Sequence, residues 1–163
     1  MRSRVLSILA TTILVAALVV LTVAGHTEAD PLVVELIAGQ HIDAGDVKVW
    51  NDGTNLYVSF ITTGDWELVE THVHVATTPE GIPQKNGNPI PGKFKYRQTS
   101  QPYSIPLGSW GTGTQLFIAA HAVVANSKTG QTETAWGALS DGYGYGYGFS
   151  GKNWATYFPY SVQ

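Results

Sequence analysis

Hydrophobic residues after residue 30 occur in short runs rich in β-branched and aromatic side chains, and clusters of Gly, Pro, Asn and Asp separate these runs. No segment repeats with the period of a helix, whereas short β-prone runs between turn residues are typical of a sandwich or barrel. The pattern predicts about eight strands, over residues 32–37, 46–50, 56–62, 66–76, 103–107, 115–125, 132–139 and 154–162. We therefore expect one all-β domain over residues 30–163, an antiparallel two-sheet β-sandwich of immunoglobulin-like or jelly-roll-like type.

The turn Asn51-Asp52-Gly53 joins two of these runs and predicts a β-hairpin. Side chains alternate along a strand, so one face of this hairpin should be apolar. That face would consist of Val47, Val49, Leu56, Val58 and Phe60.

Two further segments depart from simple alternation. Residues 115–125 (QLFIAAHAVVA) are apolar on both faces, which predicts a central strand. Residues 79–93 are rich in Pro and Gly, and we expect them to form an ordered coil rather than a strand or helix.

The first 29 residues have a different pattern, typical of a secretory signal. Arg2 and Arg4 precede an apolar run over 5–24, and the small and polar residues 25–29 follow before Asp30. We expect cleavage before Asp30, which would make the protein secreted or extracytoplasmic. The run is also long enough to span a bilayer, so an uncleaved N-terminal anchor, with membrane contact through this segment alone, stays an alternative.

Composition excludes several classes of function. The chain has no Cys and Met1 is its only Met, so disulfides, cysteine catalysis and thiolate or methionine copper sites are excluded. Residues 30–163 carry seven Lys and Arg against eleven Asp and Glu, a net charge of −4. An acidic domain of this kind is not expected to bind nucleic acid or anionic membrane surfaces.

The histidines are the strongest candidates for chemistry. Glu70, His72 and His74 alternate on one predicted strand, so they share a face with about 6.7 Å between successive members. Two imidazoles at this spacing can bind one ion, with a third ligand from His121 or Glu133 on other strands. The alternative is a structural polar core, in which a buried His121 is hydrogen-bonded to Glu133.

Other chemistry has weaker support. Asp43, Asp46, Asp52 and Asp65 lie in predicted turns, where carboxylates can hold Ca²⁺ but more often form the turn itself. The candidate cofactors are therefore none, or a Zn, Cu or Ca ion. The chain carries no serine-nucleophile motif, phosphate loop or paired carboxylates, which favours a non-catalytic protein.

Aromatic residues offer a candidate contact surface. Residues 142–149 (GYGYGYGF) alternate Gly with Tyr143, Tyr145 and Tyr147, which is typical of a flexible loop or of an adaptable surface for sugars or proteins. Trp50 and Trp110 lie beside turns, and we expect them to be exposed and to join this surface. Trp136 and Trp154 are expected to pack in the core or at its edge.

Several short strings occur together, namely AGQ (38–40), NDG with LYV (51–58), ETH (70–72), GNP (87–89), PGKF (91–94), AAHA (119–122), ETAWG (133–137) and NWA (153–155). In these strings the chain resembles an uncharacterised class of exported β-sandwich domains of bacteria and archaea. The resemblance implies a surface-associated domain with no assigned chemistry. It also implies Tyr in place of His74 in other members, which makes His72, His121 and Glu133 the better candidate cluster.

These observations favour an extracytoplasmic, non-catalytic β-sandwich module that binds or builds the cell surface or matrix. One alternative is a carbohydrate-binding module that uses the Gly-Tyr segment, and another is a metal-binding protein with a His/Glu site. Self-assembly is a variant of the first hypothesis. The β-prone segment Leu32–Ile37 would then either pair in its own sheet or add to the edge of a neighbouring molecule.

Overall fold

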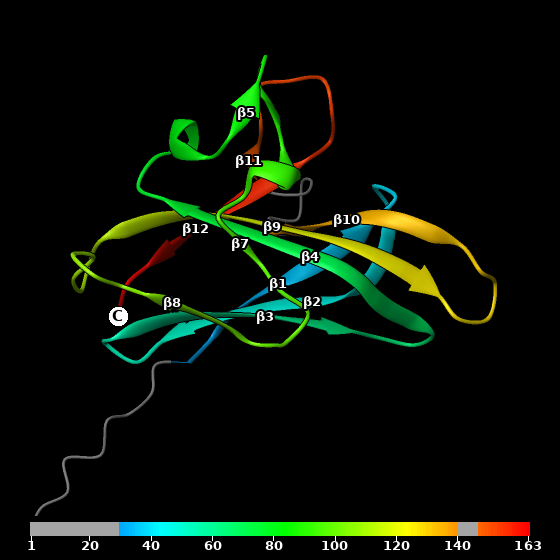
Figure 1. Cartoon of the computed structure of the whole chain (residues 1–163), viewed down its shortest axis with the longest axis horizontal. Coiled ribbons are helices and arrows are strands. Elements are labelled where there is room, and N and C mark those ends of the chain that lie inside the picture. Colours follow the sequence, from blue (N-terminus) through cyan, green and yellow to red (C-terminus); the bar gives the residue numbers. More distant parts are fainter. Residues whose placement is uncertain (1–29, 140–146) are drawn as a thin grey trace, which may run out of the picture.

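A computed structural model describes residues 30–139 and 147–163 of the chain. These residues form an all-β, antiparallel structure, as predicted (Figure 1). The long strands are β1 (Leu32–Ala38), β2 (Ile42–Asn51), β3 (Asn55–Thr62), β4 (Trp66–Ala76), β8 (Tyr103–Pro106), β9 (Gln115–Asn126), β10 (Thr132–Ala138) and β12 (Thr156–Ser161). Each of these eight overlaps one of the eight predicted strands.

Hydrogen bonds join ten strands of the described residues into one nearly closed, barrel-like sheet. Its main path runs β11-β12-β9-β10-β1-β2-β3-β8, where β11 is Tyr147–Gly148, and β4 pairs with β9 and with β7 (Tyr96–Arg97). The β8 end of this path approaches β4, where the Tyr103 hydroxyl donates to the Thr71 carbonyl at 2.9 Å. The division into two sheets that the sequence suggests stays a prediction.

Strand β9 is the centre of this sheet. It pairs with β4 along one edge over residues 117–126, except for a register shift. Its other edge pairs with β12 over residues 115–118 and with β10 over residues 121–125, so two strands lie end to end against it. The predicted central position of this segment is confirmed.

Strand β1 lies between β2 and β10, and both of its edges are hydrogen-bonded within the chain. The segment Leu32–Ile37 therefore pairs in its own sheet, which is the first of the two alternatives that the sequence left open. Addition of this segment to another molecule would require its removal from the centre of the sheet.

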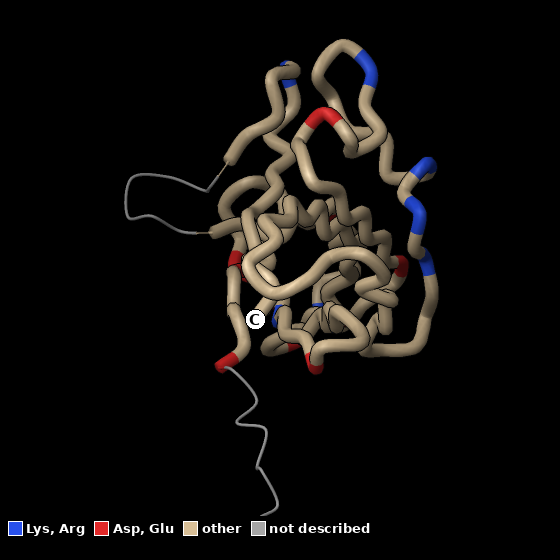
Figure 2. Tube along the Cα trace, turned by 90° about the vertical axis from the view of Figure 1, so that its left-hand side faces the viewer, with Lys and Arg blue, Asp and Glu red and all other residues tan. Residues whose placement is uncertain are grey.

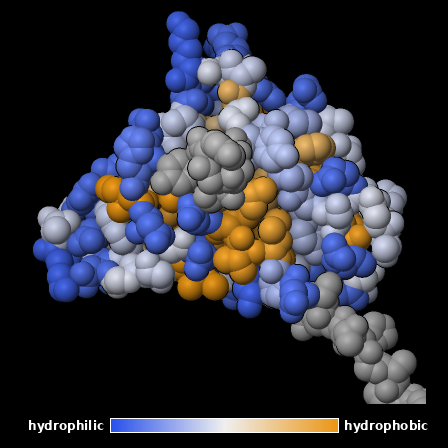
Figure 3. Space-filling view, turned by 180° about the vertical axis from the view of Figure 1, so that it is seen from behind, coloured by the Kyte–Doolittle hydropathy of each residue, from blue (hydrophilic) through white to orange (hydrophobic). Residues whose placement is uncertain are grey.

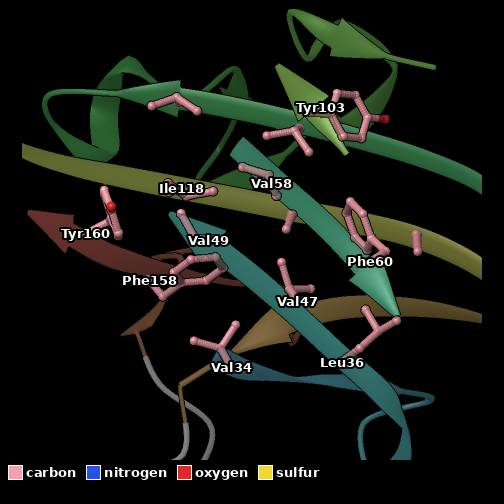
Figure 4. Close-up of a cluster of buried hydrophobic side chains, with 14 of the residues drawn as sticks. Val34, Leu36, Val47, Val49, Val58, Phe60, Tyr103, Ile118, Phe158 and Tyr160 are labelled. Atoms are coloured by element: carbon pink, nitrogen blue, oxygen red, sulfur yellow. The ribbon is translucent and has the colours of Figure 1, made fainter. Parts of the chain in front are cut away.

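The main core fills the inside of the curved sheet (Figure 4). The hairpin of β2 and β3 places Val47 opposite Phe60 and Val49 opposite Val58, and all four side chains are buried. The predicted apolar face of this hairpin is thus confirmed. Phe158 and Tyr160 from β12 complete the core, and the Tyr160 hydroxyl donates to Asn51 Oδ1 at 2.6 Å.

A second, smaller cluster covers the outer face of β9 and β10. It contains Trp136, Ala119 and Ala155, closed by Ile82 and Phe94 from the segment between β4 and β7 and by Phe149. This segment is not the coil that we predicted. It forms two 3₁₀ turns, η1 (Pro79–Gly81) and η2 (Pro91–Lys93), and a hairpin of β5 (Gln84–Lys85) and β6 (Asn88–Pro89).

The segment between β4 and β7 (residues 77–95) and the segment around 149–153, which together we call the cap, lie above β9 and β12 (Figure 1). One side chain connects the two parts of the cap: Asn88 Oδ1 accepts the backbone N–H groups of Lys152 and Asn153, at 2.9 and 3.0 Å. No helix among residues 30–139 and 147–163 is long and apolar enough to cross a membrane.

Gly137 on β10 faces the main core at a point where there is no room for a side chain. A Cβ atom there would lie 2.9 Å from Phe158 Cε1 and 3.3 Å from Ala120 Cβ and Val47 Cγ2. We predict that Gly137→Ala lowers the free energy of unfolding by about 1–3 kcal/mol because the added methyl overpacks the core. Gly111→Ala is the control, since nothing lies within 4 Å of its Cβ position. Urea unfolding measures both, and equal stabilities of the two variants would contradict the prediction.

Candidate functional site

Two of the predicted histidines meet on the outer face of the sheet. His72 on β4 lies directly opposite His121 on β9, and their Nδ1 atoms are 3.2 Å apart. Their neighbours Thr71 and Val73 point into the main core, so alternation turns His72 outward. The cap and its cluster cover this face, which leaves His72 only 4% and His121 only 7% exposed. We call these two residues the histidine pair.

The histidine pair belongs to a row of residues that crosses the sheet. Strand register places Arg97 beside His72, and Trp136 beside His121. The Trp136 ring meets the His121 ring edge to face, with 4.8 Å between centroids. The pair is therefore flanked by a cation on one side and by an indole on the other.

Glu70 is the nearest carboxylate. Its Oε1 atom lies 3.0 Å from His72 Nε2, and its side chain is 56% exposed. The contact has the distance of an ion pair, but it lacks the alignment of a hydrogen bond, and His72 Nε2 is buried without a hydrogen-bond partner among the described residues. Glu70 thus marks the side of the pair that faces solvent.

Burial keeps the histidine pair neutral at pH 7. It lowers the pKa of His121 to about 4, with a smaller contribution from the charge of His72. Burial is also the main cause of the lowered pKa of His72, where Glu70 acts in the opposite direction and Arg97 in the same direction. Because one neutral ring can donate to the other, one proton between the Nδ1 atoms satisfies both.

The structure does not bring Glu133 to His121, and the predicted contact between them is corrected. His121 pairs with Trp136, and Glu133 pairs with Val124. Glu133 is three residues from Trp136, and side chains alternate along a strand, so Glu133 lies on the face opposite to His121. Glu133 Oε1 instead accepts a hydrogen bond from Gln131 Nε2 at 2.9 Å.

His74 is engaged elsewhere, although it shares a strand face with His72. Its Nδ1 atom accepts the Lys95 backbone N–H at 3.2 Å, and its ring meets Phe94 edge to face. Burial, followed by the charge of Lys95, lowers its pKa. Across residues 30–139 and 147–163, no group of three or more His, Asp or Glu side chains is placed to hold a metal ion.

Of the four aspartates that we considered for Ca²⁺, Asp43 and Asp46 lie in strand β2, so the prediction that they lie in turns was wrong. Three of the four have other partners. Asp52 accepts hydrogen bonds from the backbone of Thr54 and Asn55 and from the Tyr57 hydroxyl, which lower its pKa. Asp43 accepts the Gly45 N–H at 3.0 Å, and Asp65 pairs with Lys128. Asp52 thus shapes its turn, Asp65 ties its turn to Lys128, and Asp43 holds the backbone at Gly45 within β2.

A hollow of about 340 Å³ lies on the surface of the cap. The turn at Pro79 and Glu80 forms one side with Gln84, and residues 148–150 with the Tyr157 ring form the other. Tyr147 stacks on Tyr157, with 5.8 Å between centroids and 26° between planes, and is 50% exposed. Tyr157 in turn meets Phe149, whose ring contacts the buried Trp136.

The other predicted contact residues lie apart from this hollow. Tyr143 and Tyr145 lie outside the described residues. Trp50 and Trp110 are half-buried rather than exposed, because Trp50 stacks on Tyr57 and Trp110 packs against the main core. Trp136 is buried and Trp154 packs against the second cluster, as predicted.

Surface character differs between faces. Four of the seven Lys and Arg of residues 30–163 fall between Lys85 and Arg97, and Figure 2 shows basic residues along this edge of the tube. Seen from behind, an apolar patch interrupts a mostly hydrophilic surface (Figure 3). The net acidic charge of the domain therefore does not describe every part of its surface.

No family model, curated protein or solved structure matches this chain.

The sequence does not indicate that Glu80, Gln84 and Tyr157 lie around one hollow. Glu80 and Gln84 lie in the Pro-rich segment, which has no period that predicts their direction. Alternation along residues 156–161 could have placed Tyr157 on the face opposite Phe158, but not beside Tyr147.

The lowered pKa of His121 predicts an acid-sensitive fold. In the unfolded chain a histidine protonates near pH 6.5, whereas the folded His121 protonates near pH 4. The unfolded state therefore binds more protons between these values, so stability is complete above pH 6.5 and falls as the pH drops toward 4. From pH 7 to pH 5 this residue should remove about 2 kcal/mol from the free energy of unfolding.

Urea unfolding at pH 7 and pH 5 measures this loss. His121→Gln should show a smaller loss than the unaltered protein, since its side chain does not titrate. His41→Gln, at an exposed turn, should retain the full loss. If His121→Gln kept the whole pH dependence, the assignment to His121 would be refuted.

Proposed function

We propose that this protein is an extracytoplasmic, non-catalytic binding module that attaches to a component of the cell surface or matrix. The secretory signal pattern of residues 1–29 supports the location, and the resemblance to exported β-sandwich domains supports the class. The observation that carries the binding role is the exposed Tyr147 ring, stacked on Tyr157 beside the hollow.

The aromatic platform, Tyr147 and Tyr157, is held from below. Contacts run from the buried Trp136 through Phe149 to Tyr157, and Tyr147 lies at the exposed end. A ring that is already ordered loses little conformational entropy when a ligand stacks on it. Half of Tyr147 stays exposed in the folded protein, which is the arrangement of a contact residue rather than of a core residue.

Carbohydrate is the ligand class that this platform favours. An aromatic face packs against the C–H groups of a sugar ring, and nearby polar side chains then bind its hydroxyl groups. Glu80 and Gln84 supply a carboxylate and an amide on the other side of the hollow. Gln84 Nε2 donates to the Pro79 carbonyl at 3.1 Å, which holds the amide in place.

A two-layered, sandwich-like arrangement is also part of this proposal. The hairpin of β2 and β3 faces β4 and β9 across the shared core, with Val47 and Val58 from one layer and Val73 and Ile118 from the other. In this arrangement the outer face of the layer with β4 and β9 carries the cap, and the binding surface lies on the cap.

We predict that Tyr147→Ala weakens glycan binding about five- to tenfold, because removal of a stacked ring costs about 1–1.4 kcal/mol. The measurement is binding of the full chain to a glycan array, followed by a titration with the strongest glycan. Tyr57→Ala is the matched control, since Tyr57 also stacks on an outer ring, Trp50, away from the hollow.

Tyr147→Ala should melt at nearly the same temperature as the unaltered protein. The variant changes Tyr147 alone and leaves Phe149 in place, because Phe149 is 8% exposed and belongs to the second cluster. Loss of binding in Tyr57→Ala with full binding in Tyr147→Ala would place the surface at Trp50 instead. Absence of binding to any glycan would remove carbohydrate as the ligand.

A further inference from the structure

The hydrogen bond between the two Nδ1 atoms leaves one nitrogen of the histidine pair, His72 Nε2, without a hydrogen-bond partner among the described residues. Two buried Nδ1 atoms from different strands are 3.2 Å apart, and the remaining nitrogen of His72 has a carboxylate beside it without an aligned hydrogen bond. We infer that His72 and His121 are the protein ligands of a transition-metal site of the zinc or copper class, with both Nδ1 atoms bound to the ion.

The distance between the two nitrogens fits this assignment. Histidine binds Zn²⁺ at about 2.0–2.1 Å, so two ligands at a tetrahedral angle lie about 3.3 Å from each other. The observed separation is 3.2 Å, which requires almost no movement of the strands. Each ring must turn by roughly 35° so that its lone pair points to a shared ion instead of to the other ring.

Glu70 completes the arrangement from outside. When a histidine binds a metal through one nitrogen, its other nitrogen carries hydrogen, which is most often donated to a carboxylate or carbonyl group. His72 Nε2 has the Glu70 carboxylate at 3.0 Å for this purpose. The exposed position of Glu70 also places a negative charge at the solvent side, where a cation would enter.

The ion class follows from the ligand type. Two neutral imidazoles favour Zn²⁺ or copper, whereas Ca²⁺ and Mg²⁺ require oxygen ligands. Two protein ligands are fewer than the four of a structural zinc site, so we expect weaker binding than in such sites. The guanidinium of Arg97 is the charge that opposes binding, but its Nη2 atom donates to the Gly92 carbonyl at 2.7 Å.

Binding of the ion moves one hydrogen between ring nitrogens. In the metal-free pair, one Nδ1 carries hydrogen and the other accepts it. Binding moves that hydrogen to the Nε2 atom of the same ring, so both rings stay neutral and no net proton is released at pH 7. At lower pH, protons compete with the ion, and affinity should fall.

The test uses the full chain titrated with Zn²⁺. About a hundredfold excess over the dissociation constant should raise the melting temperature by several degrees, and EDTA should reverse the rise. His72→Asn and His121→Asn should each abolish the rise. His41→Asn and His74→Asn should retain it, since neither residue belongs to the pair.

A second measurement does not depend on variants that fold. Long-range ¹H–¹⁵N spectra of the histidine rings in the unaltered chain report which nitrogen carries hydrogen or metal. One equivalent of Zn²⁺ should move the Nδ1 resonances of two rings and leave both with hydrogen on Nε2. Binding that alters other rings instead, or no stoichiometric binding, would overturn the assignment and leave a hydrogen-bonded pair. Either result would leave the proposed glycan platform unaffected, because Tyr147 and Tyr157 do not belong to this site.

Discussion

The structure depends on one constraint, which is that β9 is apolar on both of its faces. A strand that faces water on one side can alternate apolar with polar residues, but β9 buries Ile118, Ala119, Ala120, His121 and Ala122 in succession. Such a strand must be covered twice. The curved sheet covers the inner face, and the cap covers the outer face. The unusual Pro- and Gly-rich segment between β4 and β7 is therefore a requirement of the strand beneath it.

The cap also creates both candidate sites. Strand register places His72 beside His121, and the cap removes both from water by covering the outer face of β9, which keeps the pair neutral. On its outer surface the same cap holds Phe149 and the Tyr157 ring against Trp136, which fixes the aromatic platform. One layer thus covers the proposed ion site with its inner surface and carries the proposed glycan platform on its outer surface.

Local pattern was enough to predict much of the fold. Alternation and turn residues located the hairpin of β2 and β3 and its buried face, and the absence of polar positions located β9. The prediction that His72 shares a face with Glu70 also holds. These features depend on residues that are neighbours in the sequence, where a period of two is sufficient.

The sequence could not predict features that depend on register between distant strands. Whether His121 meets His72, Trp136 or Glu133 is decided by pairings such as that of His72 and His121, 49 residues apart. A shift of one residue would have turned Glu133 toward His121. The prediction that Trp50 and Trp110 are exposed was wrong for a related reason, because their partners, Tyr57 and the main core, come from the packing of strands.

The position of β1 has a consequence for the order of folding. This first strand lies beside β10, and β12 supplies Phe158 and Tyr160 to the same core, so early and late parts of the chain enclose each other. Contacts between such distant segments form slowly, and a shortened chain lacks the residues that fill the centre. The core therefore cannot be completed while the last strand is still being made. The proposed export of this protein is compatible with this demand, since a chain that crosses a membrane in an extended form would complete its core only after it has crossed.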